Sequence, residues 1–139
     1  MIIIQNMGTK VLLIIISYFF TISTAEMQQK DVINTISGYF KTSDSHDLSG
    51  YFSPLIEMNI LSEENEYSKA QAELILRDFF SKHKPASVKI LHRINSSSNF
   101  RFGVLSFQTD KDKFRVSISM TNEGEKFLIK TIRIEYDKE

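Results

Sequence analysis

The spacing of apolar residues divides the chain into a helical part followed by a strand-rich part. Between residues 31 and 41, apolar side chains recur every three or four positions, which predicts a helix with one buried face. The clearest helix begins at Ser68, because Ser68 and Gln71 have the spacing of a capping box. Its apolar positions from Ala72 to Phe80 again share one face, and Pro85 prevents the helix from continuing.

The segment between these two helices predicts a short helical stretch and one strand. Small and polar residues after Lys41 indicate a turn into a helical segment that ends near Phe52 and is closed by Pro54. Apolar and polar residues then alternate from Ile56 to Ile60, as expected for a half-buried strand. Residues 63–65 are all polar and predict a turn.

Beyond Pro85 the apolar period changes from 3.6 residues to 2, which predicts a series of antiparallel strands joined by polar turns. The predicted strands are Val88–Ile94, Phe100–Thr109, Phe114–Met120 and Lys126–Tyr136.

Two positions in these strands suggest β-bulges. Gly103 interrupts an otherwise apolar strand, where glycine often marks a bulge or a sharp bend. In the last strand the apolar set begins at Phe127 and Ile129 and then moves to Ile132 and Ile134. One extra residue between them would explain this change of parity.

Helices first and antiparallel strands afterwards is the pattern of an α+β domain with its helices on one face of a sheet. Two bulges imply a strongly curved sheet. A curved sheet closed by helices makes a cone, and we expect a hollow inside it lined with phenyl rings.

The first twenty-five residues have the three parts of a secretory signal peptide. Lys10 precedes an apolar run, and Ser23 and Ala25 place small residues just before a cleavage site after Ala25. The uncharged run is shorter than the roughly 20 apolar residues of a spanning helix. We therefore expect a signal peptide at 1–25, a single domain at 26–139, and a protein exported to the periplasm or secreted, with no membrane segment after cleavage.

Composition narrows the classes of partner. Cleavage takes away one of the 17 Lys and Arg residues, which leaves 16 against 17 Asp and Glu, so no positive excess attracts nucleic acid. The chain has no cysteine, so its core must form by packing alone. His46, His83 and His92 lack the spacing of metal ligands, and we expect neither a metal nor a cofactor.

Several motifs resemble a bacterial family of exported domains of unknown function, which is similar to the nuclear transport factor 2-like superfamily. The resemblance covers residues 28 to 136 and implies the cone-shaped α+β fold, also described as cystatin-like. The superfamily includes isomerases, hydratases and ligand carriers, and these residues carry over no catalytic set. The motifs are Glu66–Glu73, Asp78–Phe80, Pro85, Leu91–His92, Phe127–Ile129 and Ile132–Glu135.

His92 is the first candidate for chemistry. It lies between Ile90 and Ile94 on a strand face predicted to point inward, where an imidazole could act as a base or a hydrogen-bond donor. The alternative is a core histidine that is hydrogen-bonded to a neighbour. Tyr67 precedes the helix cap and either places its hydroxyl over the mouth of the cone or packs beside the helix start. The candidate ligand pocket comprises His92, Tyr67, Phe79, Phe102 and Ile90.

The sequence favours a binding domain over an enzyme. Isomerases and hydratases of this superfamily use an inward carboxylate, but Asp78 lies off the apolar face of its helix and Glu57 alternates with apolar neighbours. We therefore expect a non-catalytic exported module that holds a small apolar ligand or a protein partner in the cone or on the sheet face. The alternative is a small isomerase or hydratase that uses His92 with Tyr67.

The sheet face also allows a homodimer. Alternate residues of one strand, Arg115, Ser117 and Ser119, would give a flat polar surface beside apolar strands.

Overall fold

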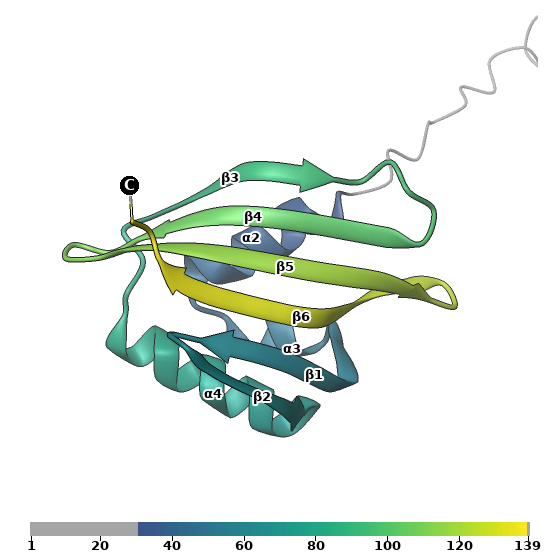
Figure 1. The fold of residues 1–139 in the computed structure, drawn as a ribbon, viewed down its shortest axis with the longest axis horizontal. Coiled ribbons are helices and arrows are strands. Elements are labelled where there is room, and N and C mark those ends of the chain that lie inside the picture. The colour runs from purple at the N-terminus through teal and green to yellow at the C-terminus, as the bar shows by residue number, and fades with distance from the viewer. Residues whose placement is uncertain (1–30, 139) are drawn as a thin grey trace, which may run out of the picture.

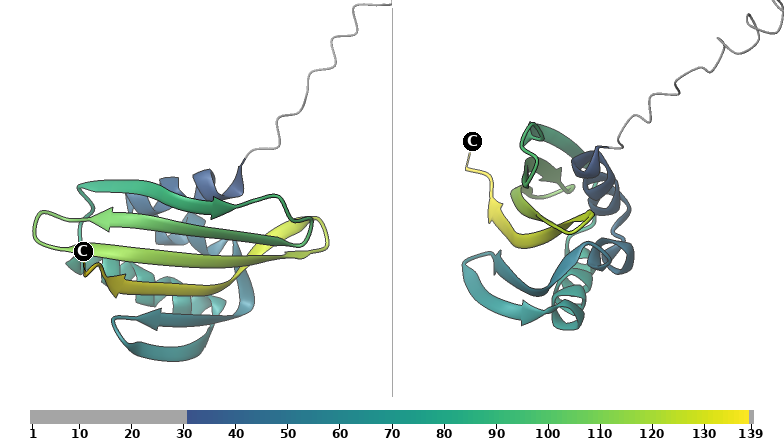
Figure 2. Two further views of the ribbon diagram at one scale, coloured as in Figure 1. Left: turned by 45° about the horizontal axis from the view of Figure 1, so that its top comes forward. Right: turned by 90° about the vertical axis from the view of Figure 1, so that its right-hand side faces the viewer.

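The computed structural model describes residues 31–138, in which three helices cover one face of a six-stranded curved sheet (Figures 1 and 2). The strand order is β2-β1-β6-β5-β4-β3. Neighbouring strands are antiparallel except β1 and β6, which run parallel. The predicted α+β architecture is confirmed, and the parallel pair is an addition to it. The elements are α2 (Val32–Thr42), α3 (Ser45–Ser49), β1 (Phe52–Ile60), β2 (Glu63–Ser68), α4 (Lys69–Lys82), β3 (Ser87–Ile94), β4 (Phe100–Gln108), β5 (Lys113–Glu123) and β6 (Lys126–Tyr136).

Both predicted long helices form, and their caps explain where they begin. The Asp31 carboxylate accepts a hydrogen bond from the Ile33 amide at 3.0 Å and caps α2. At α4 the capping box is complete, because the Ser68 hydroxyl accepts from the Gln71 amide while the Gln71 side chain accepts from the Ser68 amide. Within residues 31–138, no helix has both the length and the apolarity to cross a bilayer. The proposed signal peptide lies outside the described residues.

The hairpin of β1 and β2 differs from the sequence prediction. Residues 63–65, expected to be a turn, lie in β2, and the turn is the two-residue loop Leu61-Ser62. β2 has few apolar residues because it is an edge strand whose side chains are mostly exposed. Pro54 lies inside β1, in a stretch without ladder partners, where its missing N–H costs nothing.

The bulge predicted in the last strand is present. Ser119 of β5 pairs with Thr131, and the next residue, Met120, pairs with Ile129, so Lys130 is the extra residue of β6. Its ammonium donates to the buried Ser53 hydroxyl at 2.7 Å and also contacts Glu123. The bulge therefore keeps Ile129 and Ile132 both in the core despite the odd spacing between them.

The second bulge lies in β3 rather than at Gly103. Ile90 pairs with Leu105 and His92 pairs with Val104, which makes Leu91 the extra residue. Gly103 pairs in unbroken register with Ile118 of β5. Its role is to let α2 approach, because a Cβ at Gly103 would lie 2.9 Å from Ile33 Cγ2.

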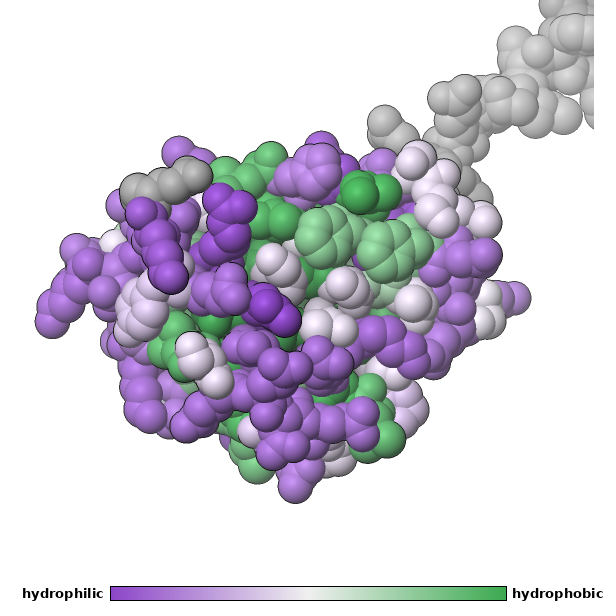
Figure 3. Space-filling model, viewed as in Figure 1, coloured by the Kyte–Doolittle hydropathy of each residue, from purple (hydrophilic) through white to green (hydrophobic). Residues whose placement is uncertain are grey.

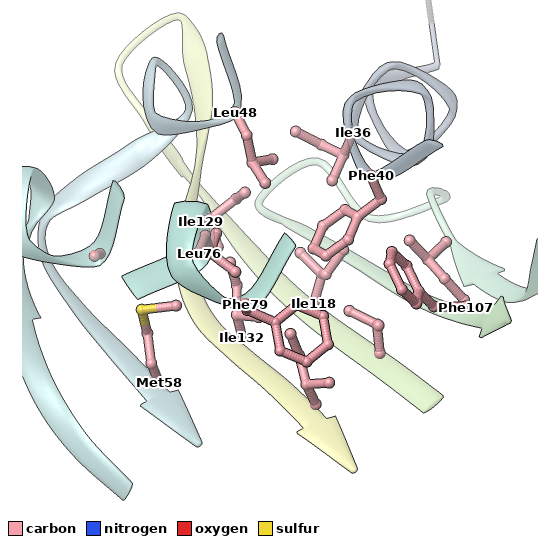
Figure 4. Packing of buried hydrophobic residues seen from close by; sticks show 14 of the residues in the cluster. Ile36, Phe40, Leu48, Met58, Leu76, Phe79, Phe107, Ile118, Ile129 and Ile132 are labelled. Carbon is pink, nitrogen blue, oxygen red and sulfur yellow. The ribbon is translucent and has the colours of Figure 1, made fainter. Parts of the chain in front are cut away.

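Phenylalanine rings fill the space between helices and sheet, so the expected hollow is not present in the described structure. Phe40, Phe79 and Phe107 point toward one another in the core (Figure 4). The Phe79 ring centroid lies 5.7 Å from that of Phe107 and 5.4 Å from that of Phe114. The Phe40 ring meets the Phe80 ring edge-on at 5.6 Å. A core packed this closely leaves room for a ligand only at its margin.

Candidate functional site

A cleft of about 300 Å³ opens at the margin of the core, between α4 and the hairpin of β1 and β2. This volume is at the lower end of the range for small-molecule sites, roughly 300–1,000 Å³. The lining is apolar on its floor and polar at its rim. The apolar members are Met58, Ile60, Leu61, Ile75 and Phe79, and the polar members are Glu63, Tyr67, Asp78, Lys82 and His83.

One edge of α4 supplies four of the ten lining side chains. Ile75, Asp78 and Lys82 follow one another at spacings of three and four residues, so they lie along the same side of the helix. The Lys82 ammonium donates to the Asp78 carboxylate at 2.8 Å, and both side chains are more than half exposed. The ion pair therefore places charges of both signs at the rim without closing the cleft.

His83 ends the helix at one corner of the cleft. Its backbone N–H donates to the Phe79 carbonyl at 2.9 Å, which completes the last turn of α4. The imidazole lies against two phenyl rings, with its centroid 4.7 Å from that of Phe79 and 4.9 Å from that of Phe114. These contacts fix the ring plane, so His83 presents a polar edge in a defined place.

The hairpin forms the opposite wall. Tyr67 pairs with Ile56, and Glu63 pairs with Ile60, so both side chains are on the helix-facing side of β2. The loop residues Leu61 and Ser62 have φ of 51° and 78°, the left-handed region that favours glycine. The Leu61 amide donates to the Ile134 carbonyl of β6 at 2.9 Å, which ties this strained loop to the sheet.

The structure brings together two of the five predicted pocket residues. Tyr67 and Phe79 both line the cleft. Ile90 is half-buried against the core and does not line the cleft. His92 and Phe102 lie on the other face of the sheet, where the His92 side chain is exposed.

The inward orientation predicted for His92 is wrong, and the bulge at Leu91 is the reason. Strict alternation puts residues 90, 92 and 94 on one face, but an extra residue at position 91 reverses the faces. Ile90 therefore faces the core beside Leu105, while His92 lies beside Val104 on the opposite face. His92 and Tyr67 are on opposite sides of the sheet, so the pair required by the alternative prediction of an isomerase or hydratase does not form in the described structure.

Four polar members of the cleft are not predicted from the sequence: Glu63, Asp78, Lys82 and His83. A signal for His83 was available, since it follows Phe79 by four residues and so continues the buried stripe of α4. Asp78 lies off the apolar face of α4, as the sequence predicts, but the cleft opens at the side of that face. Glu63 could not be placed because β2 was not recognised as a strand.

A second polar cluster connects α3 to α4. The Glu73 carboxylate accepts from Arg77 at 3.0 Å and lies 3.2 Å from His46 Nδ1. The Ser49 hydroxyl donates to the His46 carbonyl at 2.6 Å and approaches Glu73 at 3.4 Å. The hydroxyl is thus directed at a carbonyl and a carboxylate rather than at the imidazole, which is not the contact of a nucleophile with its base. The cluster holds two helices together.

The cleft contains no arrangement suited to a metal ion. Among the side chains of residues 31–138, no three His, Asp or Glu residues lie close enough to share a cation. Its charged groups include both acids and bases, so it suits an uncharged polar group that can donate and accept hydrogen bonds.

Residues 33–135 match the protein family described as a domain of unknown function, DUF4783. The chain belongs to this family. A crystal structure of a DUF4783 protein from Bacteroides uniformis is similar, with 27% identity and a TM-score of 0.74, over 78% of this chain and 100% of that one. None of the curated proteins matches the sequence.

More distant structures show the same fold. A designed NTF2-like protein with a long sheet has 17% identity and a TM-score of 0.60, over 73% of this chain and 94% of that chain. A domain of unknown function with a cystatin-like fold from Nostoc punctiforme has 8% identity and a TM-score of 0.60, over 76% and 73% of the two chains. The DUF4783 domain is therefore a member of the NTF2-like fold class, as its sequence motifs predicted.

Proposed function

We propose that this DUF4783 domain is an exported, non-catalytic binding module that holds a small amphipathic molecule in the cleft between α4 and the β1–β2 hairpin. The observation that supports this most is the lining of the cleft. Met58, Ile75 and Phe79 offer an apolar floor, while Tyr67 and His83 offer polar atoms at the rim. A site of this kind binds an apolar body and orients it through a few polar contacts.

Size and charge narrow the ligand class. The volume of about 300 Å³ suits a small molecule of up to three rings or a short alkyl chain. The Asp78–Lys82 pair neutralises itself, so a strongly charged ligand would have to break an existing ion pair. A neutral molecule with one alcohol, amide or amine group fits these constraints. The signal-peptide pattern of residues 1–25 supports the export part of the proposal.

The test uses N-phenyl-1-naphthylamine, a neutral aromatic amine whose fluorescence rises in apolar surroundings. The exported protein, purified from periplasm or medium, should bind it. Ile75→Trp places a large ring in the cleft and should weaken binding by at least about tenfold. Leu74→Trp is the matched control, because Leu74 is the adjacent residue of α4, is 58% exposed and is outside the cleft lining.

Two results would contradict the proposal. One is the absence of a fluorescence change with the unmodified protein. The other is equal weakening by Ile75→Trp and Leu74→Trp, which would mean that the probe binds outside the cleft. Thermal unfolding of both variants, followed by circular dichroism, shows that each is folded at the temperature of the assay.

A further inference from the structure

A second cavity, of about 510 Å³, lies where β6 ends, between the loop of the β1–β2 hairpin and the beginning of β5. Leu61 and Ser62 line it from the loop, Arg115 lines it from β5, and residues 135–138 line it from the end of β6 and beyond. Figure 3 shows the sheet from the face away from the helices, with hydrophilic side chains gathered at its left, where β5 begins and β6 ends in Figure 1. The lining is therefore mainly polar, and the pairing of its charges decides what it can bind.

The two acids of this lining have cationic partners that lie outside it. Glu135 Oε1 is 3.5 Å from Arg133 Nη1. The Asp137 carboxylate is 3.3 Å from Lys113 Nζ, and the Asp137 amide also donates to the Lys113 carbonyl at 2.8 Å. Arg133 and Lys113 are not members of the lining. The negative charges of the cavity are therefore neutralised from outside it.

The two cations of the lining, Arg115 and Lys138, have no such partner. None of the carboxylates of residues 31–138 forms an ion pair with either of them. Arg115 lies directly across from Glu135 in the β5–β6 ladder, yet the Glu135 carboxylate is paired with Arg133. Arg115 is also half-buried, and a partly desolvated guanidinium without a counter-ion attracts an anion.

We propose that this cavity, here called the Arg115 site, binds a small organic carboxylate. A guanidinium presents parallel N–H donors whose spacing matches the two oxygens of one carboxylate. The Ser62 hydroxyl and the Lys138 ammonium are further donors in the same lining. Glu135 and Asp137 disfavour a dianion such as phosphate, because both would repel each additional negative charge on the ligand.

The apolar surface of the Arg115 site indicates what kind of molecule carries the carboxylate. The Tyr136 ring lies against the Phe114 ring with centroids 4.9 Å apart, and 51% of Tyr136 stays exposed. Leu61 lies in the same lining, and its amide is held by the Ile134 carbonyl of β6 at 2.9 Å. An aromatic ring packs well on a fixed phenol ring. The ligand class is therefore an aromatic or short-chain carboxylate whose acid group contacts Arg115.

The Arg115 site and the cleft beside α4 differ in charge, although Leu61 lines both. In the cleft, Asp78 and Lys82 pair with each other, so no cation of that ion pair is free for an anionic ligand. In the Arg115 site, the guanidinium is free. A neutral amphipathic molecule and a carboxylate are therefore expected at different places, and each can be tested without the other.

The test is a ¹H–¹⁵N NMR titration of the purified protein with benzoate at constant ionic strength. Benzoate should shift the amide signals of Ser62, Arg115 and Tyr136 together, and the shifts should saturate at millimolar concentrations. Benzamide, which has the same shape and no charge, should leave these signals unchanged. Raising the salt concentration should weaken the binding of benzoate, because the guanidinium is only half-buried.

Four variants assign the binding to the guanidinium. Arg115→Gln should weaken benzoate binding by about tenfold, and Arg115→Lys, which keeps the charge and loses the fork, should weaken it less. Glu135→Gln should strengthen binding, because it removes the acid that lies across from Arg115. Arg77→Gln is the matched control, since Arg77 is an exposed arginine of α4 outside the cavity, and it should leave the affinity unchanged. Circular dichroism melts show whether each variant is folded.

Several outcomes would overturn the inference. Equal shifts with benzamide would show that the charge is not recognised, and phosphate binding as tight as that of benzoate would exclude a carboxylate site. Unchanged affinity in a folded Arg115→Gln variant would place benzoate elsewhere, as would the absence of a saturable shift at Ser62 and Tyr136. Shifts confined to Tyr67, Ile75 and His83 would assign benzoate to the cleft instead.

Discussion

Tyr39 and Tyr51 form an aromatic pair beside the short helix α3, with ring centroids 6.0 Å apart. Loss of solvent around the phenol raises the pKa of Tyr39 above its ordinary value of 10.0, and the neighbouring Tyr51 and the Asp47 carboxylate raise it further. The neutral phenol is therefore favoured in the folded state, more than in the unfolded chain.

This shift predicts a loss of stability at alkaline pH. Below pH 10 both states keep the proton, so stability is unaffected. As the pH rises above 10 toward the raised pKa of the folded state, the unfolded chain loses the proton first and the free energy of unfolding falls. Tyr39→Phe should flatten this fall in a series of thermal melts from pH 8 to 11. Equal slopes for the two proteins would contradict the prediction.

A separate prediction concerns Ser62 in the strained hairpin loop. Its φ of 78° lies in the left-handed region, which costs a residue with a Cβ roughly 1 kcal/mol. Ser62→Gly should therefore stabilise the protein by about that amount, as measured by urea denaturation. The opposite substitution is the comparison at Gly38, which lies within α2 at an ordinary helical φ. Gly38→Ala should stabilise the protein through helix propensity alone. A destabilised Ser62→Gly variant would show that the loop is not strained.

The residues of the cleft could be predicted only in part, and His92 and Phe79 show why. Phe79 belongs to α4, and the helical period places all the apolar residues of that helix on one face. Its inward direction could therefore be predicted from the sequence. His92 belongs to a strand, where a single extra residue reverses every later side chain. Leu91 is apolar like its neighbours, so nothing in the alternation identified it as that residue.

At the scale of elements, α2 packs on the sheet through one close contact. Ile33 lies over Gly103, where a Cβ would come within 2.9 Å of Cγ2 and 3.2 Å of Cδ1 of Ile33. Glycine at this position therefore allows α2 to pack close to the sheet. The sequence indicated that Gly103 was special but could not distinguish a bulge from a close approach, since both favour the absence of a side chain.

Gly103→Ala should destabilise the domain by about 1–3 kcal/mol, because the added methyl overpacks the contact between α2 and β4. In the background of Ile33→Ala, which removes the clashing atoms, the same substitution should cost almost nothing. A double-mutant cycle by chemical denaturation measures this coupling. Equal costs of Gly103→Ala in the two backgrounds would show that Ile33 is not the cause.

The bulge of β6 was predictable, whereas that of β3 was not, and the difference lies in burial. β6 is a central strand, so its core residues must be apolar and the change from Ile129 to Ile132 is visible in the sequence. β3 is an edge strand whose second half is exposed, so its residues there need not follow a pattern. Edge strand β2 escaped recognition for the same reason.

At the scale of the whole molecule, the two faces of the sheet differ because the helices pack on only one of them (Figure 1). The helix-covered side is filled with phenyl rings except for the cleft beside α4, and the other side of the curved sheet exposes both polar and apolar side chains. The sequence predicted the cone but overestimated its hollow, because an apolar pattern shows which residues are inside and does not show how completely they fill the space. Among the described residues, six phenylalanines are buried and close the interior: Phe40, Phe52, Phe79, Phe80, Phe107 and Phe114.

The most direct test of the proposed cleft is a ¹H–¹⁵N NMR titration of the exported protein with N-phenyl-1-naphthylamine. We expect the amide signals of Leu61, Tyr67, Ile75 and His83 to shift together and saturate, while those of His92 and Phe102, on the sheet face away from the helices, do not. Shifts confined to β3 and β4, or no saturable shift at all, would contradict it.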